Sequence, residues 1–231
     1  MRLLLAVLCA LVATAAAAHA EVPPPRQSLC LMLESAATAN RLPLPFLARI
    51  IWRESRFDPQ AVGPVTRSGA RAEGIAQFMP NTAAERAVAD PFDPVDALPK
   101  AAAFLGTLRD DLGNLGLAAA AYNAGPARVR GWLAGTRTLP IETRDYVHAV
   151  TGHAAEEWAK AGAVDMVVPR QDCVTLVASL EQGPSRFFSE LERRVATAIG
   201  QPWGIELAAG FSRARVLAGY AKLMDRLSNL L

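Results

Sequence analysis

Apolar residues recur at intervals of three and four over much of residues 28–160, the spacing expected of amphipathic helices. The first stretch predicts a helix from about residue 28, with an apolar face formed by Leu29, Met32, Leu33, Ala36 and Ala37. The second predicts a helix that ends before Pro59, with an apolar face formed by Phe46, Leu47, Ile50 and Ile51. Residues 60–73 show no period and contain Gly-Pro and Ser-Gly pairs, which predicts a loop.

Two short signals predict where the next helices begin. Thr82 followed by Glu85 has the spacing of a capping box, and it predicts a short helix that ends near residue 90. Asp93 before Pro94 predicts an N-cap followed by proline at the first helical position. We expect this second helix to run to Gly113 and to bury a row of leucines.

Residues 115–160 predict further helices. Residues 115–124 are almost wholly apolar, which indicates a central helix buried on all sides. Pro126 and Pro140 each begin another helix, and no strand pattern competes before residue 160. We therefore predict a mainly α fold for residues 21–161, a cluster of short helices in one domain.

The pattern changes after residue 161 and predicts a small α+β appendage over residues 162–231. The expected elements are a linker at 162–170, a strand at 173–180, a helix at 185–199, a strand at 203–209 and a helix at 212–227. The last two elements are faintly similar to half of a sporulation-related repeat, a module that binds glycan. A docking platform for a partner and a packing extension are the alternatives.

The N-terminus has the features of a secretory signal peptide. Arg2 supplies a positive charge, residues 3–12 are apolar, and Ala18 and Ala20 form an A-x-A cleavage site. The apolar run is shorter than the roughly 20 residues of a spanning helix, so a membrane anchor is the weaker interpretation. We predict cleavage after residue 20 and export of the mature protein.

Cleavage would remove Cys9 and leave Cys30 and Cys173 as the remaining cysteines. In an oxidising compartment these two are candidates for one disulfide, and two buried free thiols are the alternative. The bridge would tie the first helix to the region after the main domain.

Charge and residue types exclude several classes of function. The chain has 24 basic and 22 acidic residues and no clustered basic face, which argues against a nucleic-acid-binding protein. No His, Cys and Asp cluster has the spacing of metal ligands, and His148 and His153 are most simply surface residues. We therefore expect neither a metal nor an organic cofactor.

Glu54 is the most informative single residue. It lies four residues after Ile50 and eight after Phe46, so it shares their apolar face. It also lies in the last turn of its helix, where the helix dipole disfavours a negative charge. Both effects raise the pKa of a carboxyl, as a general acid for a glycosidic oxygen requires. The alternative is a carboxylate paired with Arg53 or Arg56.

Three motifs carry a resemblance to a known family. ESRFDP stands at residues 54–59, GIAQFMP at 74–80 and AYNAGP at 121–126, in that order. Together they resemble the soluble lytic transglycosylases, and the similarity extends from about residue 30 to 158. The resemblance implies a lysozyme-like fold and an enzyme that cuts the glycan strands of peptidoglycan.

The resemblance also implies a role for each matching residue. Glu54 occupies the position of the family's single catalytic glutamate. Gln77 and Met79 match positions that line the glycan cleft. Tyr122 matches a tyrosine whose hydroxyl approaches the glutamate, and Asn123 stands beside it at the cleft floor.

A further family segment is similar to LPIETRDYV at residues 139–147, which makes Glu142 a substrate-binding residue and Tyr146 a further candidate. Each of these residues has a structural alternative. These are a turn cap for Gln77, core packing for Met79, another buried partner for Tyr122, a helix end for Asn123 and a first-turn charge for Glu142.

One position departs from the family pattern. Where the family has a serine after the Ala-Val pair, this chain has Gly63, and the loop to Gly74 is longer than usual. Thr66 or Ser68 would have to fold back to replace the serine hydroxyl.

A single acid suits substrate-assisted chemistry, since the motifs contain no second carboxylate of the kind that other glycosidases use. The resemblance implies that Glu54 protonates the oxygen between N-acetylmuramic acid and N-acetylglucosamine, and then removes the C6 hydroxyl proton to close a 1,6-anhydro ring. The alternatives are a hydrolase similar to goose-type lysozyme and an inactive glycan-binding protein. We expect a periplasmic monomer whose partner is the glycan strand, and a protein partner in the cell envelope or a secretion apparatus is left open.

Overall fold

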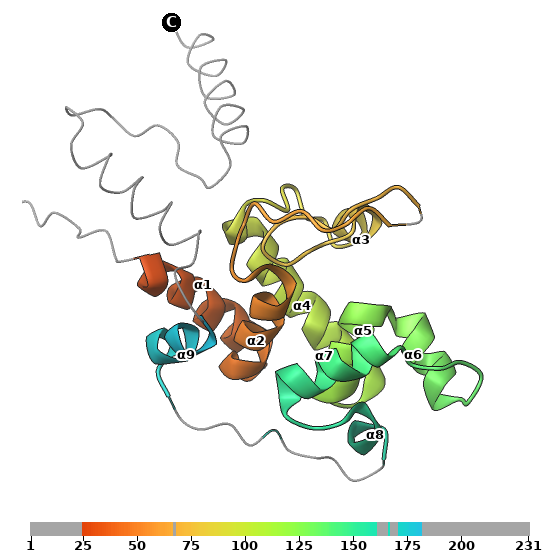
Figure 1. Cartoon of the computed structure of the whole chain (residues 1–231). Helices are drawn as coiled ribbons and strands as arrows, with labels where there is room; N and C mark the ends of the chain where they lie inside the picture. Colours follow the sequence, from red (N-terminus) through yellow and green to blue (C-terminus); the bar gives the residue numbers. More distant parts are fainter. Residues whose placement is uncertain (1–24, 67, 161–165, 167–170, 182–231) are drawn as a thin grey trace, which may run out of the picture.

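The computed structural model describes residues 25–66, 68–160, 166 and 171–181 (Figure 1). Its helices are α1 (Pro25–Ala39), α2 (Leu44–Ser55), α3 (Pro80–Glu85), α4 (Pro94–Leu112), α5 (Leu115–Ala124), α6 (Pro126–Leu133), α7 (Ile141–Thr151), α8 (Ala155–Trp158) and α9 (Cys173–Leu180). Among these residues the only β pairing is two isolated bridges within the loop after α2. The predicted mainly α fold is confirmed for this part of the chain.

Helix α5 lies at the centre of the helix cluster, packed against α4, α6, α7 and α8 (Figure 1). Every residue from Gly116 to Ala121 is buried. The small side chains of this segment let the neighbouring helices approach closely. The Asn114 side chain caps the helix by accepting a hydrogen bond from the Leu117 N–H at 2.9 Å. The prediction of a central helix buried on all sides is confirmed.

The start of α4 is also as predicted. The Asp93 carboxylate accepts a hydrogen bond from the Val95 N–H at 3.0 Å, and Pro94 is the first helical residue. The helix ends at Gly113, which adopts the left-handed conformation at φ 91°.

The predicted capping box of Thr82 and Glu85 is wrong. Helix α3 begins at Pro80, with Met79 in extended conformation at the N-cap, so Thr82 lies inside the helix. The helix also ends at Glu85 rather than near residue 90. Proline fixes the backbone angle that a first helical residue needs, and it starts the helix two residues before the threonine.

The predicted strand at 173–180 is also wrong, because these residues form α9. Asp172 caps the helix by accepting a hydrogen bond from the Thr175 N–H at 2.9 Å. Cys173, Leu176 and Val177 are buried at helical spacing. Figure 1 shows α9 packed against α1 and α2, which cover its apolar face.

The predicted disulfide is confirmed. Cys30 of α1 and Cys173 of α9 are bonded, with their Cα atoms 5.7 Å apart. Arg26 of α1 and Glu181, the residue that follows α9, form an ion pair at 2.8 Å. The bridge closes a loop of 143 residues in sequence separation, which in a chain-entropy account stabilises the fold by a few kcal/mol.

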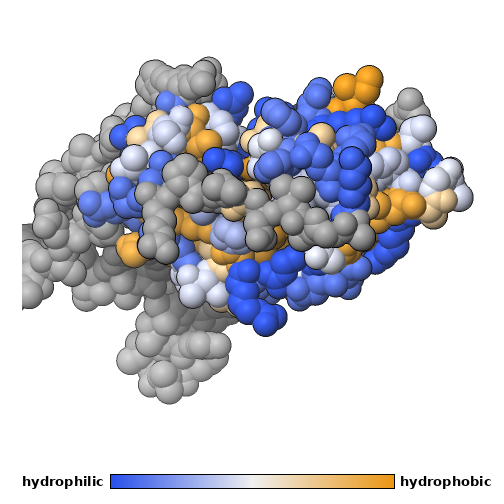
Figure 2. Space-filling view, turned by 90° about the horizontal axis from the view of Figure 1, so that it is seen from below, coloured by the Kyte–Doolittle hydropathy of each residue, from blue (hydrophilic) through white to orange (hydrophobic). Residues whose placement is uncertain are grey.

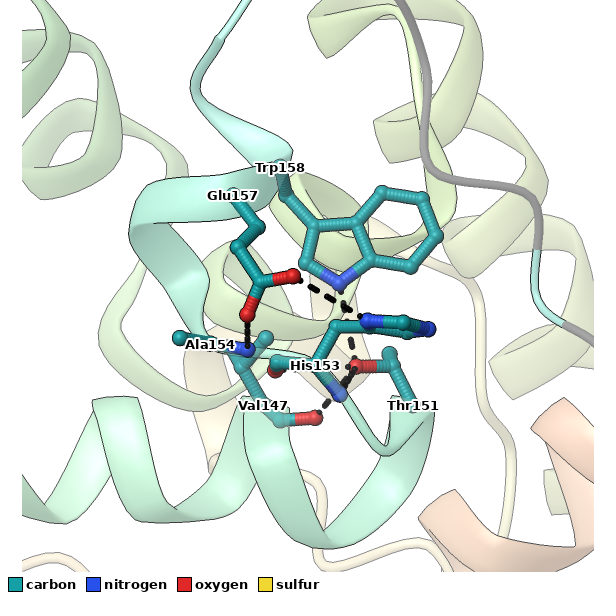
Figure 3. Close-up of polar contacts among 6 residues, drawn as sticks. All are labelled: Val147, Thr151, His153, Ala154, Glu157 and Trp158. Carbon is teal, nitrogen blue, oxygen red and sulfur yellow. Dashed lines mark hydrogen bonds and ion pairs between the residues drawn. The ribbon is translucent and has the colours of Figure 1, made fainter.

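A polar network joins the end of α7 to α8 (Figure 3). The Trp158 indole N–H donates to the Thr151 hydroxyl at 3.0 Å, and that hydroxyl donates to the Val147 carbonyl at 2.8 Å. Glu157 accepts from the Ala154 N–H at 2.9 Å and contacts the His153 ring at 3.2 Å. The Trp158 ring packs directly on α5 at Gly116, where a Cβ would overlap the ring.

The surface of the described residues is mixed in character. On the face drawn in Figure 2, polar side chains cover much of the described surface, and apolar ones form smaller patches between them. Within the same residues no helix is both long and apolar enough to cross a membrane.

The other predicted segments lie outside the described residues. These are the signal peptide at 1–20, most of the linker at 162–170, the helix at 185–199, the strand at 203–209 and the helix at 212–227. The division into a domain at 21–161 and an appendage at 162–231 stays a prediction.

Candidate active site

Glu54 lies in the last turn of α2, where a buried hydrogen bond holds the helix end in place. The hydroxyl of the next residue, Ser55, donates to the Ile75 carbonyl at 2.7 Å. Ser55 is buried, so this bond fixes the end of α2 to the segment 74–78. The chain then turns sharply, because Arg56 and Phe57 both adopt left-handed backbone angles, at φ 56° and 60°. Such angles are costly for residues with side chains and are typical of functional sites.

The segment 74–78 is held by the loop that precedes it. Glu73 and Phe78 exchange two backbone hydrogen bonds of 3.0 Å, and the Gly74 N–H donates to the Ala61 carbonyl at 2.9 Å. Gly74 has φ 75° and lies against the backbone of Pro91, so a Cβ at this position would overlap the Pro91 carbonyl. The loop therefore depends on glycine at residue 74.

The Glu54 carboxyl receives one strong hydrogen bond. The Tyr146 hydroxyl, from α7, donates to Glu54 Oε1 at 2.6 Å. Tyr146 is itself buried, and Arg53 lies over its ring with the guanidinium carbon 6.0 Å from the centroid. Among the described residues no Lys, Arg or His nitrogen lies within 4.0 Å of the Glu54 carboxylate, so the alternative of a paired carboxylate is not supported.

Burial raises the pKa of Glu54 from 4.5 to about 7. The hydrogen bond from Tyr146 and the charge of Arg53 act in the opposite direction and lower this pKa, whereas the charge of Glu142 raises it. Loss of water is the largest of these effects, because an ionised carboxylate is strongly disfavoured away from solvent. Near neutral pH the carboxyl is therefore present in both its acidic and its basic form.

The Tyr122 hydroxyl forms its hydrogen bond with the segment 74–78. Its hydroxyl donates to the Ala76 carbonyl at 2.8 Å, and the hydrogen bond to Glu54 comes from Tyr146 instead. The Tyr122 ring packs at a tilt against Phe104 and Phe78, with centroid distances of 5.6 and 6.5 Å. Burial, and then the charge of Glu54, raise the pKa of Tyr122. Tyr122 thus lies near Glu54 while it holds the segment 74–78.

The Gln77 side chain bonds to backbone carbonyls of the loop, as in the alternative role of a turn cap. Its side-chain N–H group donates to the carbonyls of Ala61 and Gly74 at 3.1 and 2.9 Å, and its own backbone is left-handed at φ 49°. Met79 is half-buried at the N-cap of α3. The glycan-binding roles of both residues stay predictions.

Gly63, which stands where the family has a serine, lies next to the Gln77 side chain. A Cβ at residue 63 would lie 3.0 Å from Gln77 Oε1, so the family's serine would point at this amide. The predicted replacement by Thr66 or Ser68 is wrong. The Thr66 hydroxyl donates to the Ala70 carbonyl at 2.8 Å and lies 3.0 Å from the Ser68 hydroxyl, so both stay within the exposed loop tip.

Asn123 and Glu142 lie at adjoining helix ends. The exposed Asn123 accepts a hydrogen bond from the buried Thr143 hydroxyl at 2.8 Å, which joins the end of α5 to the start of α7. Glu142 is exposed in the first turn of α7, and its influence on the pKa of Glu54 places it on the same side of the molecule. Both positions are compatible with glycan binding, which stays a prediction.

Two positioning residues were missed at the sequence level. Ser55 fixes the helix that carries Glu54, and Thr143 fixes Asn123. Each stands next to a candidate site residue in a quoted motif, Ser55 after Glu54 and Thr143 after Glu142. Adjacency in a motif was the available signal, and a serine or threonine at a helix end is otherwise attributed to capping.

Tyr146→Phe tests the carboxyl–hydroxyl contact. Removing this hydrogen bond, worth roughly 1.5–3 kcal/mol when the acceptor is charged, takes away an effect that lowers the pKa of Glu54. We expect the pKa of Glu54 to rise, so that the midpoint of its titration moves to higher pH, measured by NMR of a labelled glutamate side chain. Tyr122→Phe is the matched control, because its hydroxyl bonds to Ala76, and an equal shift in that variant would contradict the assignment.

The site thus consists of one half-buried glutamate with a raised pKa at a helix end in a helical domain. Within the described residues, its side-chain hydrogen bond comes from a tyrosine and not from a second carboxyl. Residues 32–144 match the family described as "Transglycosylase SLT domain". This segment is just under half of the 231 residues, and over it the chain is similar to that family.

Solved structures of two such proteins are similar to this chain. An inactive mutant of the lytic transglycosylase Slt from Pseudomonas aeruginosa is 32% identical, with a TM-score of 0.45, over 52% of this chain and 22% of that one. The 70 kDa soluble lytic transglycosylase from Escherichia coli is 27% identical, with a TM-score of 0.45, over 55% of this chain and 23% of that one. The chain thus spans under a quarter of the length of these structures.

Proposed function

We propose that this protein is a peptidoglycan lytic transglycosylase in which Glu54 acts first as the acid and then as the base. The observation that carries the proposal is the pKa of Glu54, which burial raises to about 7 within a transglycosylase SLT domain. A group with this pKa exchanges a proton readily in either direction at neutral pH.

The first step is protonation of the oxygen between N-acetylmuramic acid and N-acetylglucosamine. Because the Tyr146 hydroxyl donates to Oε1 of Glu54, the proton to be delivered is carried on Oε2. As the glycosidic bond breaks, its electron pair goes to the protonated leaving oxygen. The 2-acetamido group of the muramic acid stabilises the cationic carbon that remains.

The second step uses the same carboxyl as a base. Glu54, now ionised, takes the proton of the muramoyl C6 hydroxyl, and that oxygen bonds to the cationic carbon and closes a 1,6-anhydro ring. Tyr146 supports this step, because its hydrogen bond stabilises the carboxylate. The acid is restored at the end, and the chemistry needs neither water nor a cofactor.

The proposal also includes the binding residues, the domain division and the compartment predicted from the sequence. The glycan strand is the partner, with Gln77, Met79, Tyr122, Asn123, Glu142 and Tyr146 as the binding residues. Residues 21–161 form the catalytic domain and residues 162–231 an appendage. The protein acts as a monomer in the periplasm, where the signal peptide would deliver it.

Mass spectrometry of the soluble products from purified peptidoglycan tests the reaction. We expect muropeptides with 1,6-anhydro ends from the mature protein, and none from a Glu54→Gln sample purified in the same way. Products with reducing ends would instead make the protein a hydrolase. A folded protein that binds peptidoglycan and releases nothing would make it a glycan-binding protein.

A further inference from the structure

A surface pocket forms between α6 and the segment that follows it, and Glu54 is not among the residues that line it. It is an open pocket of about 500 Å³ lined by Arg128, Gly135, Thr136, Arg137 and Thr138. Arg128 belongs to α6, and the other residues belong to the segment between α6 and α7. No candidate catalytic or glycan-binding residue lines this pocket, so it is a separate feature of the surface.

The pocket wall formed by Arg137 is built by specific contacts. The Gly131 carbonyl accepts hydrogen bonds from the N–H groups of Thr136 and Arg137, at 2.8 and 3.1 Å, and from the Thr136 hydroxyl at 3.0 Å. A Cβ at Gly131 would lie 2.9 and 3.0 Å from Cδ and Cγ of Arg137. The absence of a side chain at residue 131 therefore lets the aliphatic part of Arg137 lie along α6.

The charge of the pocket is uncompensated. Both charged residues that line it, Arg128 and Arg137, are cationic and exposed, and neither forms an ion pair within the part of the chain that the structure describes. The neighbouring arginines are paired, Arg130 with Asp111 at 3.4 Å and Arg144 with Glu156 at 3.0 Å. The two guanidinium groups of the pocket are thus available for an external anion.

Planar guanidinium groups bind carboxylates and phosphates through paired N–H donors. The residues that line the pocket are close in sequence to two candidate glycan-binding residues. Asn123 precedes Arg128 by five residues and Glu142 follows Thr138 by four. The hydrogen bond between Asn123 and Thr143 holds these two ends together.

We infer that this pocket binds the carboxylates of the peptide stem that peptidoglycan carries on N-acetylmuramic acid. The inference rests on the proposed function, since a glycan strand in the cleft would present its stems to the flanking surface. Stem peptides have several free carboxylates and no compensating cluster of cations. The pocket would therefore distinguish strands that keep their peptides from strands that have lost them.

Titration of the mature protein with the free stem tripeptide L-Ala-γ-D-Glu-diaminopimelate, followed by NMR, tests the pocket without any cleavage. We expect shifted amide signals within residues 128–138. Arg128→Gln and Arg137→Gln should each weaken binding by about tenfold, the effect of losing hydrogen bonds to a charged group. Arg130→Gln is the matched control on the same helix, and it should leave the tripeptide affinity unchanged.

A phosphate titration and a second Arg137 variant complete the experiment. Inorganic phosphate that binds as tightly as the tripeptide would overturn the assignment to peptide stems. If Arg137→Gln fails to fold, Arg137→Lys replaces it, because lysine keeps the long aliphatic side chain and the positive charge. This variant should still weaken tripeptide binding, because an ammonium lacks the paired N–H donors of a guanidinium. Equal tripeptide affinity in the wild type and all arginine variants would also overturn it.

Cleavage assays separate this inference from the proposed function. Wild-type protein should have a lower KM for peptide-bearing strands than for strands stripped by an amidase, and the Arg128→Gln/Arg137→Gln double variant should lose this difference. Cleavage of both substrates with equal KM would refute the pocket and keep the enzyme. Tripeptide binding without cleavage of either substrate would refute the enzyme and keep the pocket.

Discussion

Glu54→Gln is expected to lower the rate of glycan cleavage by about two to four orders of magnitude, the usual contribution of a positioned acid or base. Glutamine keeps the shape of the side chain, and its carbonyl oxygen can still accept the hydrogen bond from Tyr146. The variant lacks only the exchangeable proton. Retention of more than about a tenth of the wild-type rate would contradict the assignment of Glu54.

The same substitution is expected to stabilise the fold at alkaline pH. The pKa of Glu54 is about 7 in the folded protein against an ordinary 4.5, so the ionised form is less favourable in the folded than in the unfolded state. The stability that Glu54 contributes is complete below pH 4.5 and is lost as the pH rises through 7. The difference of about 2.5 units corresponds to at most roughly 3 kcal/mol, and the partial exposure of Glu54 reduces it.

Urea denaturation at pH 4.5, 7 and 9 measures this effect. We expect equal unfolding free energies for Glu54→Gln and wild type at pH 4.5, and a gain of about 1–3 kcal/mol for the variant at pH 9. Glu34→Gln, an exposed change on α1, is the control for the general loss of a carboxylate. Parallel pH profiles for wild type and Glu54→Gln would show that burial does not disfavour the ionised carboxyl.

Helical periodicity and helix-end signals predicted much of the fold. The apolar faces around Phe46 and Ile50, the Asp93 cap and the buried segment at 115–124 all agree with the structure. These features are local, because the side chains that define them lie within a few turns of one another. The position of Glu54 on an apolar face at a helix end was also a local property, and it correctly indicated a raised pKa.

The features that local sequence patterns do not determine depend on contacts distant in sequence. The choice between Tyr122 and Tyr146 as the donor to Glu54 is made by the packing of α7 against α2, across 92 residues. Helix α9 was predicted as a strand because its β-branched and apolar residues suit both structures. Burial against α1 and the Asp172 cap decide in favour of the helix.

Gly74→Ala is expected to have the largest effect on stability. Gly74 combines a left-handed backbone, φ 75°, with the closest approach to a neighbouring chain segment, because its missing Cβ would overlap the Pro91 carbonyl. The left-handed conformation costs an alanine about 1–2 kcal/mol, and overpacking against backbone adds about 1–3 kcal/mol. We expect a total loss of about 2–5 kcal/mol, measured by urea denaturation.

Gly69→Ala is the control that isolates the steric part of this loss. Gly69 lies in the same loop at φ 81°, yet no atom outside its chain neighbours lies within 4 Å of its missing Cβ. This variant should lose only the stability that the left-handed backbone conformation costs an alanine, about 1–2 kcal/mol. Gly74→Ala should also reduce catalysis in the fraction that stays folded, because the carbonyls of Ile75 and Ala76 anchor Ser55 and Tyr122. Equal losses in the two variants would show that the contact with Pro91 does not constrain the loop, and would remove the reason for glycine at residue 74 beyond its backbone angle.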